Sequence, residues 1–173
     1  MLHILKSASM ALLLTLSATV LAQSDSLSVF SDMDGKPQRL EDHTGGGKWL
    51  VVMIWASDCH ICNIEAPTYN TFHQAQQDKG TAVLGISMDG EEHRAAAMKF
   101  IERHDLSFPN LIGEPGMVSL YYAAMTQESL RGTPTFLVYD PDGEIVAAQA
   151  GAVSVDAIES FIAKQNAARL ANQ

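Results

Sequence analysis

The sequence predicts an α/β fold with a central mixed β-sheet flanked by helices. A continuous apolar run at 49–55 and a mainly apolar run at 83–88 have the length and the β-branched composition of strands that are buried on both faces. A stretch with helical periodicity follows each run. A third run, 135–139, precedes a turn and a segment that we expect to return as an antiparallel strand. Because strands alternate with helices and one pair is joined by a tight turn, the sheet should contain both parallel and antiparallel neighbours.

The first half of the chain supplies the segments around the longest apolar run. Turn-forming residues at 32–37 (Asp-Met-Asp-Gly-Lys-Pro) indicate an N-terminal β-hairpin. Gly80 is a suitable residue to end a helix. In chain order, the predicted elements are a hairpin of strands 28–30 and 38–40, a glycine loop at 45–47, the strand 49–55, a helix over 59–79 and the strand 83–88.

The second half continues the alternation of helices and strands. Ala97, Phe100, Ile101 and His104 recur at positions i, i+3, i+4 and i+7, which marks one face of an amphipathic helix. Ser154 can cap the last helix. In chain order, the predicted elements are a helix from about 91, a short strand at 110–112, a short helix at 117–125, the strand 135–139, a turn at 140–143, a strand at 144–148 and a final helix that contains 158, 161 and 162.

Composition and charge exclude several classes of protein. A chain of 173 residues has the size of one domain. With 20 acidic and 11 basic side chains the net charge is −9. This argues against nucleic acid as the main partner, because phosphate binding needs clustered Lys and Arg. Two cysteines cannot complete a four-thiolate zinc site or a scaffold of several disulfides.

The first 22 residues have the three-part pattern of a secretory signal peptide. Lys6 gives a short positive region, 10–21 is apolar, and 20–22 (Val-Leu-Ala) places small or short residues before an expected cut. We therefore expect 1–22 to be removed and 23–173 to form one domain. The alternative is retention as a membrane anchor, for which the stretch is short, since a spanning helix needs ~20 apolar residues. Export would place both cysteines in an oxidising compartment, which is the periplasm in a Gram-negative cell.

The most informative motif is Cys59-His60-Ile61-Cys62, which follows a predicted buried strand and begins a predicted helix. Side chains at i and i+3 of a helix have Cβ atoms ~5–6 Å apart, so a disulfide needs little adjustment. The positive end of the helix favours a thiolate on Cys59, and the second thiol can resolve a mixed disulfide. We therefore expect Cys59 to be the nucleophile and Cys62 to be the more buried resolving partner.

Two other interpretations of the cysteine pair stay open. A disulfide that closes a loop of four residues contributes only ~2 kcal/mol in the chain-entropy model, so a purely stabilising cross-link should join more distant segments. A metal site is the other alternative. The placement of the pair favours dithiol exchange over both.

Several segments resemble the thioredoxin superfamily. The run 55–62 (Trp-Ala-Ser-Asp-Cys-His-Ile-Cys) is similar to the thioredoxin active-site segment, and Pro67 matches the proline within its following helix. Thr133-Pro134 matches the cis-proline of the superfamily. The likeness extends from about Leu27 to Phe161. Within the superfamily, this chain is similar to exported thiol-disulfide oxidoreductases of the TlpA/ResA type, and the similarity lies in the segments 34–37, 65–67, 132–137 and 140–143.

The resemblance implies a thioredoxin-like fold with an N-terminal β-hairpin and one inserted βα unit. The stretch between Cys62 and Pro134 has room for that unit. The resemblance also implies that Pro134 is cis and lies against the cysteine pair. The backbone of Thr133 would then be free to pair with a substrate segment, a one-strand addition that presents its disulfide to Cys59. An ordinary trans turn proline is the alternative.

Three neighbours of the cysteines carry further expectations. The family implies an active-site carboxylate at Glu65, which could accept a proton from Cys62. The alternative for Glu65 is an exposed first-turn acid that the helix dipole favours. A protonated His60 would favour the Cys59 thiolate, whereas Asp58 would disfavour it. Asp58 also stands where thioredoxin-like proteins commonly have an aromatic residue, and both residues could simply be solvated.

The predicted function is that of an exported thiol-disulfide oxidoreductase, with net reduction of client disulfides as the preferred direction. The resemblance implies client proteins, some of them in cytochrome c maturation, and a membrane electron donor of the DsbD or CcdA type. No cofactor and no metal are expected. The alternatives are net oxidation or isomerisation, and copper binding by a thioredoxin-fold protein of the Sco type. A peroxidase is disfavoured because the residues before Cys59 lack the peroxiredoxin pattern Pro-x-x-x-Thr/Ser-x-x-Cys.

Overall fold

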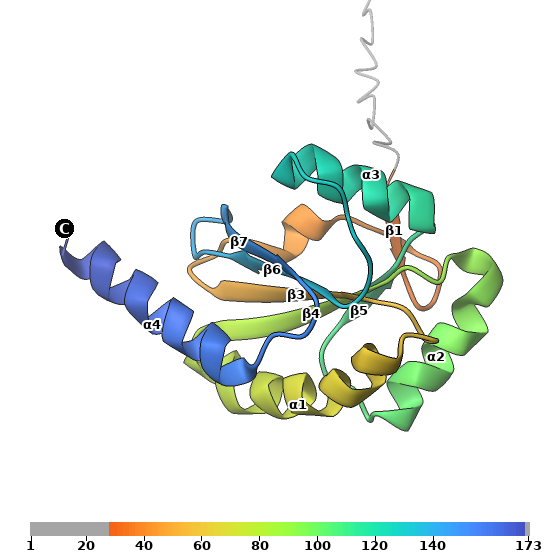
Figure 1. Cartoon of the computed structure of the whole chain (residues 1–173), viewed down its shortest axis with the longest axis horizontal. Helices are drawn as coiled ribbons and strands as arrows, with labels where there is room; N and C mark the ends of the chain where they lie inside the picture. The colour runs from red at the N-terminus through yellow and green to blue at the C-terminus, as the bar shows by residue number, and fades with distance from the viewer. Residues whose placement is uncertain (1–27, 172–173) are drawn as a thin grey trace, which may run out of the picture.

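The computed structural model describes residues 28–171, which form a mixed sheet with helices on both faces (Figure 1). The strand order is β2-β1-β5-β4-β3-β6-β7. The strands are β1 (Phe30–Asp32), β2 (Pro37–Gln38), β3 (Trp49–Trp55), β4 (Thr81–Ser87), β5 (Asn110–Ile112), β6 (Thr135–Tyr139) and β7 (Ile145–Ala150). The α-helices are α1 (His60–Gln76), α2 (Arg94–Arg103), α3 (Pro115–Thr126) and α4 (Val155–Ala171).

The predicted signal peptide, residues 1–22, lies outside the described residues, so its removal stays a prediction. The domain predicted over 23–173 is described from Ser28 onward. Within residues 28–171, no helix combines the length and the apolar character that crossing a membrane requires.

The central strand β3 determines where the functional site lies. All seven of its residues are buried, as the continuous apolar run predicts. β3 runs parallel to β4 and antiparallel to β6, with Ile54 opposite Ile86 on one side and opposite Thr135 on the other. The end of β3 therefore meets the beginning of β6, and the segments that follow 55 and precede 135 are brought to the same edge of the sheet.

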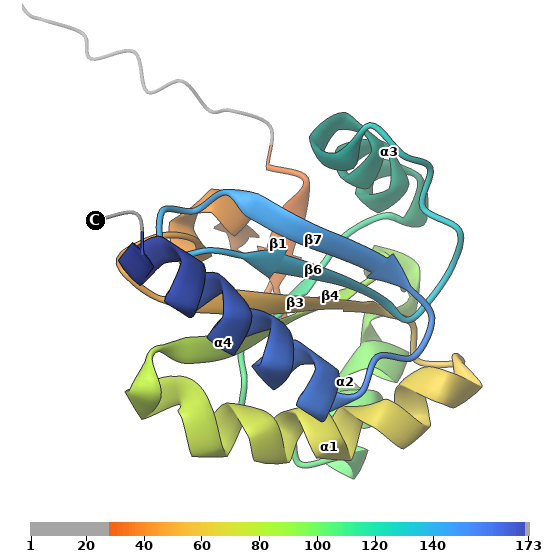
Figure 2. The same cartoon turned by 60° about the vertical axis from the view of Figure 1, so that its left-hand side comes forward.

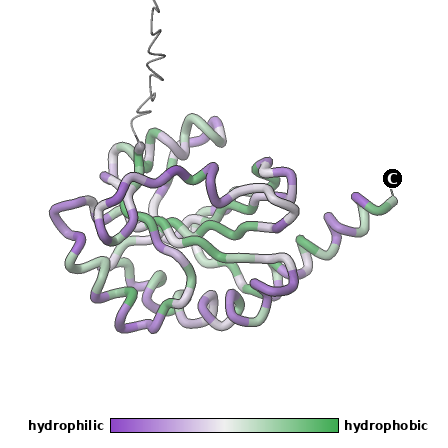
Figure 3. Tube along the Cα trace, turned by 180° about the vertical axis from the view of Figure 1, so that it is seen from behind, coloured by the Kyte–Doolittle hydropathy of each residue, from purple (hydrophilic) through white to green (hydrophobic). Residues whose placement is uncertain are grey.

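Helices cover the two faces of the sheet unequally. α1, α2 and α4 lie on one face and α3 lies on the other (Figures 1 and 2). Alternate residues of β3 point to opposite faces. Val51 and Met53 accordingly pack with α1, α2 and α4, whereas Leu50 and Val52 pack with α3. Hydrophobic residues concentrate along the inner strands, with hydrophilic residues around the periphery (Figure 3).

The structure confirms the predicted fold class, including the N-terminal hairpin and the inserted βα unit, which is β5 followed by α3. β3, β5 and β6 have the predicted bounds. The hairpin strands lie closer to the turn than expected, since Ser31 pairs with Pro37. Asp32 tightens this turn by accepting hydrogen bonds from the amides of Asp34 and Lys36. Leu40, expected in the second strand, instead begins a short 3-10 helix and buries its side chain beneath α3.

Gly85 permits the close packing of the strand that leads to the cysteines. A Cβ atom at this position would lie 1.9 Å from Oδ1 of Asn110 and 2.8 Å from the indole nitrogen of Trp55. These two side chains are hydrogen-bonded to each other, with Trp55 Nε1 donating to Asn110 Oδ1 over 3.1 Å. Glycine at 85 therefore leaves room for the contact that fixes the last residue of β3.

Candidate active site

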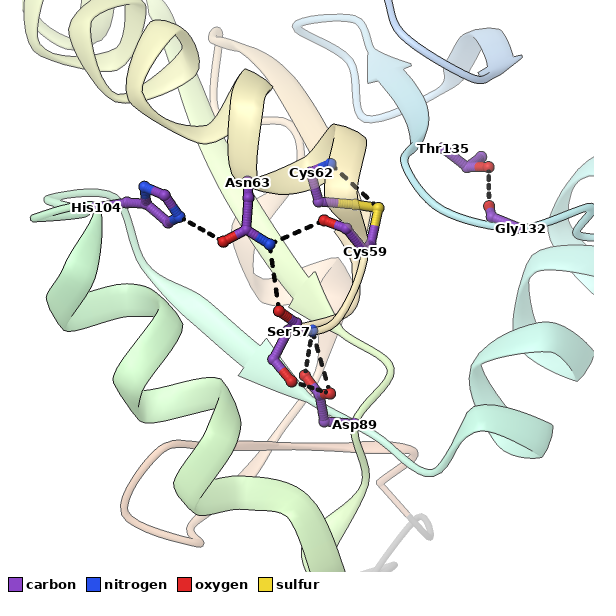
Figure 4. Close-up of a disulfide and its surroundings, with 8 residues drawn as sticks. All are labelled: Ser57, Cys59, Cys62, Asn63, Asp89, His104, Gly132 and Thr135. Carbon is purple, nitrogen blue, oxygen red and sulfur yellow. Dashed lines mark hydrogen bonds between the residues drawn. A yellow bond between two sulfur atoms is a disulfide. The ribbon is translucent and has the colours of Figure 1, made fainter.

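The cysteine pair lies at the beginning of α1 and forms a disulfide (Figure 4). Cys59 is the N-cap residue, and the two Cα atoms are 5.2 Å apart. The backbone amide of Cys62 donates a hydrogen bond to the sulfur of Cys59 over 3.1 Å. Such an amide, together with the helix dipole, stabilises negative charge on that sulfur once the disulfide is reduced.

The two cysteines differ in exposure. Cys59 is half-buried, whereas Cys62 has 0% of its surface exposed. The side chain of Cys62 packs in the core with Trp55 and Ala66. A large reactant can therefore reach the first sulfur and not the second, which is the order of access that the sequence predicts.

The loop before β6 faces the disulfide (Figure 4). The peptide bond between Thr133 and Pro134 is cis, as the resemblance implies, and Pro134 is buried. The hydroxyl of Thr135 donates to the carbonyl of Gly132 over 2.7 Å, and the amide of Gly151 donates to the carbonyl of Pro134 over 2.8 Å. Within residues 28–171, no hydrogen bond uses the amide or the carbonyl of Thr133. Its role in substrate binding stays a prediction.

Glu65 lies one turn after Cys62, on the same helix. Its side chain is half-buried and has no hydrogen-bond partner within the described part of the chain. Burial raises the pKa of the Tyr69 hydroxyl, and the negative charge of Glu65 raises it further. This hydroxyl donates a hydrogen bond to the carbonyl of Val153 over 2.7 Å. The structure thus brings Glu65 near the pair, and its role as a proton acceptor stays a prediction.

Asp58 and His60 are exposed on either side of Cys59. Neither side chain forms a hydrogen bond or an ion pair with another residue in 28–171. Their tuning roles stay predictions.

Asp89 is a structural residue of the site that the sequence analysis did not identify. It follows β4, and its carboxylate accepts hydrogen bonds from the backbone amide and the hydroxyl of Ser57 and from the hydroxyl of Ser87. Ser57 is two residues before Cys59, so Asp89 fixes the turn between β3 and α1. No local motif could have identified this contact, because the partners are 32 positions apart.

Asn63 is the second residue that sequence reasoning missed. It follows Cys62 and donates from its amide group to the carbonyl oxygens of Cys59 and Ser57 (Figure 4). Its oxygen faces Nε2 of His104, at the C-terminal end of α2, over 2.9 Å. Burial lowers the pKa of His104, and the positive charge of Arg103 lowers it further. His104, which the sequence pattern places on the apolar face of this helix, is half-buried at this contact.

Within residues 28–171, no group of three or more His, Cys, Asp or Glu side chains is arranged to hold a metal ion. The chemistry that the described residues do present is that of a disulfide between two cysteines at the start of a helix, faced by the loop that contains the cis peptide bond before Pro134 (Figure 4).

Comparisons with known proteins agree with this geometry. The model of the AhpC/TSA family matches residues 21–148. The thiol-disulfide oxidoreductase ResA of Bacillus thuringiensis subsp. konkukian is 27% identical over 136 residues, covering 79% of this chain and 73% of the relative.

Two solved structures are similar over most of their length. The thioredoxin domain of a thiol-disulfide oxidoreductase from Bacteroides vulgatus is 26% identical, with a TM-score of 0.62, covering 77% of this chain and 88% of that one. The exposed lipoprotein thioredoxin of Streptococcus pneumoniae is 25% identical, with a TM-score of 0.62, covering 78% and 96%.

Proposed function

This chain belongs to the AhpC/TSA family of the thioredoxin superfamily and is a thiol-disulfide oxidoreductase with a Cys-x-x-Cys pair, and we propose that it reduces disulfides of client proteins outside the cytoplasm. The observation that carries the proposal is the difference in exposure between the two cysteines: Cys59 is half-buried, whereas Cys62 is fully buried. A client disulfide can reach only the first sulfur. Cys59 therefore attacks and Cys62 resolves.

The reaction consists of two exchange steps that carry two electrons from the dithiol to the client. The Cys59 thiolate attacks one client sulfur, the client S–S bond breaks, and the other client sulfur leaves as a thiolate. Cys62 gives its proton to Glu65 and then attacks the sulfur of Cys59. This breaks the mixed disulfide and releases the second client thiolate, and both client thiolates take up protons from Glu65 and water. The Cys59–Cys62 disulfide is the oxidised product.

The loop before β6 provides the place where the client binds. The amide and carbonyl of Thr133 have no partner within residues 28–171. They lie at the end of the sheet where β3 leads into residues 56–59, the turn that carries Cys59 and is called the cysteine turn below. An extended client segment can add to this backbone as a short strand, because main-chain hydrogen bonds do not depend on the client's sequence. Pro134 offers no amide hydrogen next to this position, which leaves Thr133 as the pairing residue.

Export and an electron supply complete the proposal. Residues 1–22 have the pattern of a signal peptide, and a similar solved protein is described as an exposed lipoprotein. In an oxidising compartment a reductase must be reduced again by a donor that brings electrons across the membrane. We assign that part to a membrane protein of the DsbD or CcdA type. Proteins of cytochrome c maturation are the client class that the resemblance suggests.

Reduction of insulin disulfides in the presence of a small dithiol tests the activity. The wild-type protein should accelerate precipitation of the insulin chains, whereas Cys59→Ser should give the rate of the small dithiol alone. A Cys59→Ser protein that turns over as fast as the wild type would exclude the proposed mechanism.

The reduction potential of the Cys59/Cys62 couple, measured by equilibration with glutathione, tests the direction. A potential near that of thioredoxin, about −270 mV, supports net reduction. A potential near that of DsbA, about −120 mV, would instead assign net oxidation and overturn the direction proposed here.

A further inference from the structure

The side chain of Asn63 connects the cysteine turn to the end of α2. Its Nδ2 atom donates to the carbonyl oxygen of Cys59 over 2.9 Å and to that of Ser57 over 3.3 Å. On the other side, its Oδ1 atom accepts from the guanidinium of Arg103 over 3.1 Å and lies 2.9 Å from Nε2 of His104. Since the two carbonyls can only accept, the NH₂ group must face them, and the oxygen must face Arg103 and His104.

These contacts restrain the backbone on both sides of Asp58. The carbonyl of Cys59 accepts from the backbone amide of Asn63 over 3.1 Å as well as from its side chain. As N-cap residue, Cys59 has the extended backbone angles φ −73° and ψ 112°. In this conformation its sulfur accepts the hydrogen bond from the amide of Cys62. One amide side chain thus holds the turn in which the sulfur faces the helix start.

We infer that Asn63 is a positioning residue, which holds Cys59 in the N-cap conformation that stabilises its thiolate. This inference rests on the proposed role of Cys59 as the attacking thiol. A hydrogen bond to a charged group is stronger than one to a neutral group, so the contact between the Cys62 amide and the sulfur strengthens once Cys59 is a thiolate. Without Asn63 the turn can leave this conformation, and the thiolate loses that bond for part of the time.

Asn70 provides a matched control on the same helix. It lies two turns after Asn63 and makes the same kind of bridge, since its Nδ2 donates to the carbonyl of Asp105 over 2.8 Å. Its Oδ1 accepts from both the amide and the hydroxyl of Ser107, each over 2.8 Å. Asn70 therefore joins α1 to the segment after α2 without touching the cysteine turn.

Substitution of either asparagine removes no charged group from the surroundings of the turn. The charged and titratable groups near it are Asp58 and His60 on the turn, Glu65 on α1, Arg103 and His104 from α2, and Asp89 from the segment after β4. A change in the thiolate of Cys59 that follows Asn63→Ala and not Asn70→Ala is therefore caused by the lost amide contacts.

The experiment measures the pH dependence of alkylation by iodoacetamide in the reduced full-length protein. Cys62 is fully buried, so the first alkylation reports the thiolate of Cys59. Asn63→Ala should shift the alkylation profile to higher pH and slow alkylation at neutral pH by roughly tenfold. Asn70→Ala should leave the profile at the wild-type position. Urea unfolding is recorded in parallel and should show destabilisation by both variants.

A wild-type alkylation profile for Asn63→Ala would overturn the inference, as would an equal shift caused by Asn70→Ala. Should Asn63→Ala not fold, Asn63→Leu removes the same hydrogen bonds with a side chain of similar size and gives the same test. Alkylation needs no client protein. The assay therefore reports on Asn63 even where insulin reduction fails, and the two proposals can fail separately.

Discussion

The carboxylate of Asp89 holds Ser57 by both its backbone and its side chain. The amide of Ser57 lies 3.2 and 3.1 Å from the two carboxylate oxygens, and the hydroxyl donates to one of them over 2.7 Å. The second oxygen also accepts from the hydroxyl of Ser87 over 2.6 Å. The end of β4 is in this way joined to the turn that carries Cys59. Asp89 therefore holds this turn to the sheet, and Asn63 connects it to the end of α2.

Asp89→Ala should therefore lower both stability and the rate of the first exchange step. The amide and hydroxyl of Ser57 lose their acceptors, and an unsatisfied polar group of this kind costs about 1–3 kcal/mol. Urea unfolding measures the loss, and stopped-flow reaction with a disulfide measures the rate. Asp78→Ala, at an exposed carboxylate in the segment after α1, is the control. Equal stability of the two variants would contradict the role given to Asp89.

Glu65→Gln should slow resolution of the mixed disulfide more than its formation. Gln cannot accept a proton as a carboxylate does, so Cys62 would lose its proton acceptor, whereas attack by Cys59 does not use Glu65. Rapid acid quenching of the reaction followed by mass spectrometry separates the two steps. An equal effect on both steps would remove Glu65 from the mechanism.

Stability should fall in mildly acidic solution because of His73. This side chain is buried, and its Nδ1 accepts from the amide of Val83 over 3.1 Å. Burial lowers the pKa of His73 below its ordinary value of 6.5. Between the lowered pKa and 6.5 the unfolded chain therefore binds more protons than the folded one, so the stabilisation is complete above pH 6.5 and is lost as the pH falls through this window.

Urea unfolding across this pH range tests the assignment to His73. His73→Gln should reduce the dependence of the unfolding free energy on pH, because Gln can accept the same hydrogen bond without titrating. The pKa of His104 is lowered as well, so part of the dependence should remain. The exposed His93 serves as the control, and an equal reduction by His93→Gln would count against the assignment.

The strands and the cysteine pair could be predicted from the sequence because their signals are local. The run Trp49–Trp55 is apolar throughout, so its bounds follow from composition alone. The pair at 59 and 62 is recognised by its spacing and its position between a strand and a helix. The expected hairpin strand 28–30 begins before the observed strand β1 (Phe30–Asp32), because the side chain of Asp32 tightens the turn and no pattern in 28–40 signals how far the pairing extends.

The hydrogen bonds that hold the cysteine turn could not be predicted, because they join segments that are distant in the sequence. Asn63 meets Arg103 and His104 some forty positions later, and Asp89 meets Ser57 across β4. An asparagine in a first helical turn and an aspartate after a strand are common and carry no signal of their own. Only the sheet register and the packing of α2 against α1 bring them to the cysteines.

Capture of clients by Cys62→Ser tests the central claim most directly. In this variant the mixed disulfide at Cys59 cannot be resolved, so client proteins should be found covalently bound to it and be released by a small dithiol. The double variant that also carries Cys59→Ser should capture none. Equal capture by the double variant, or full insulin turnover by Cys62→Ser alone, would contradict an attack by Cys59 that Cys62 completes.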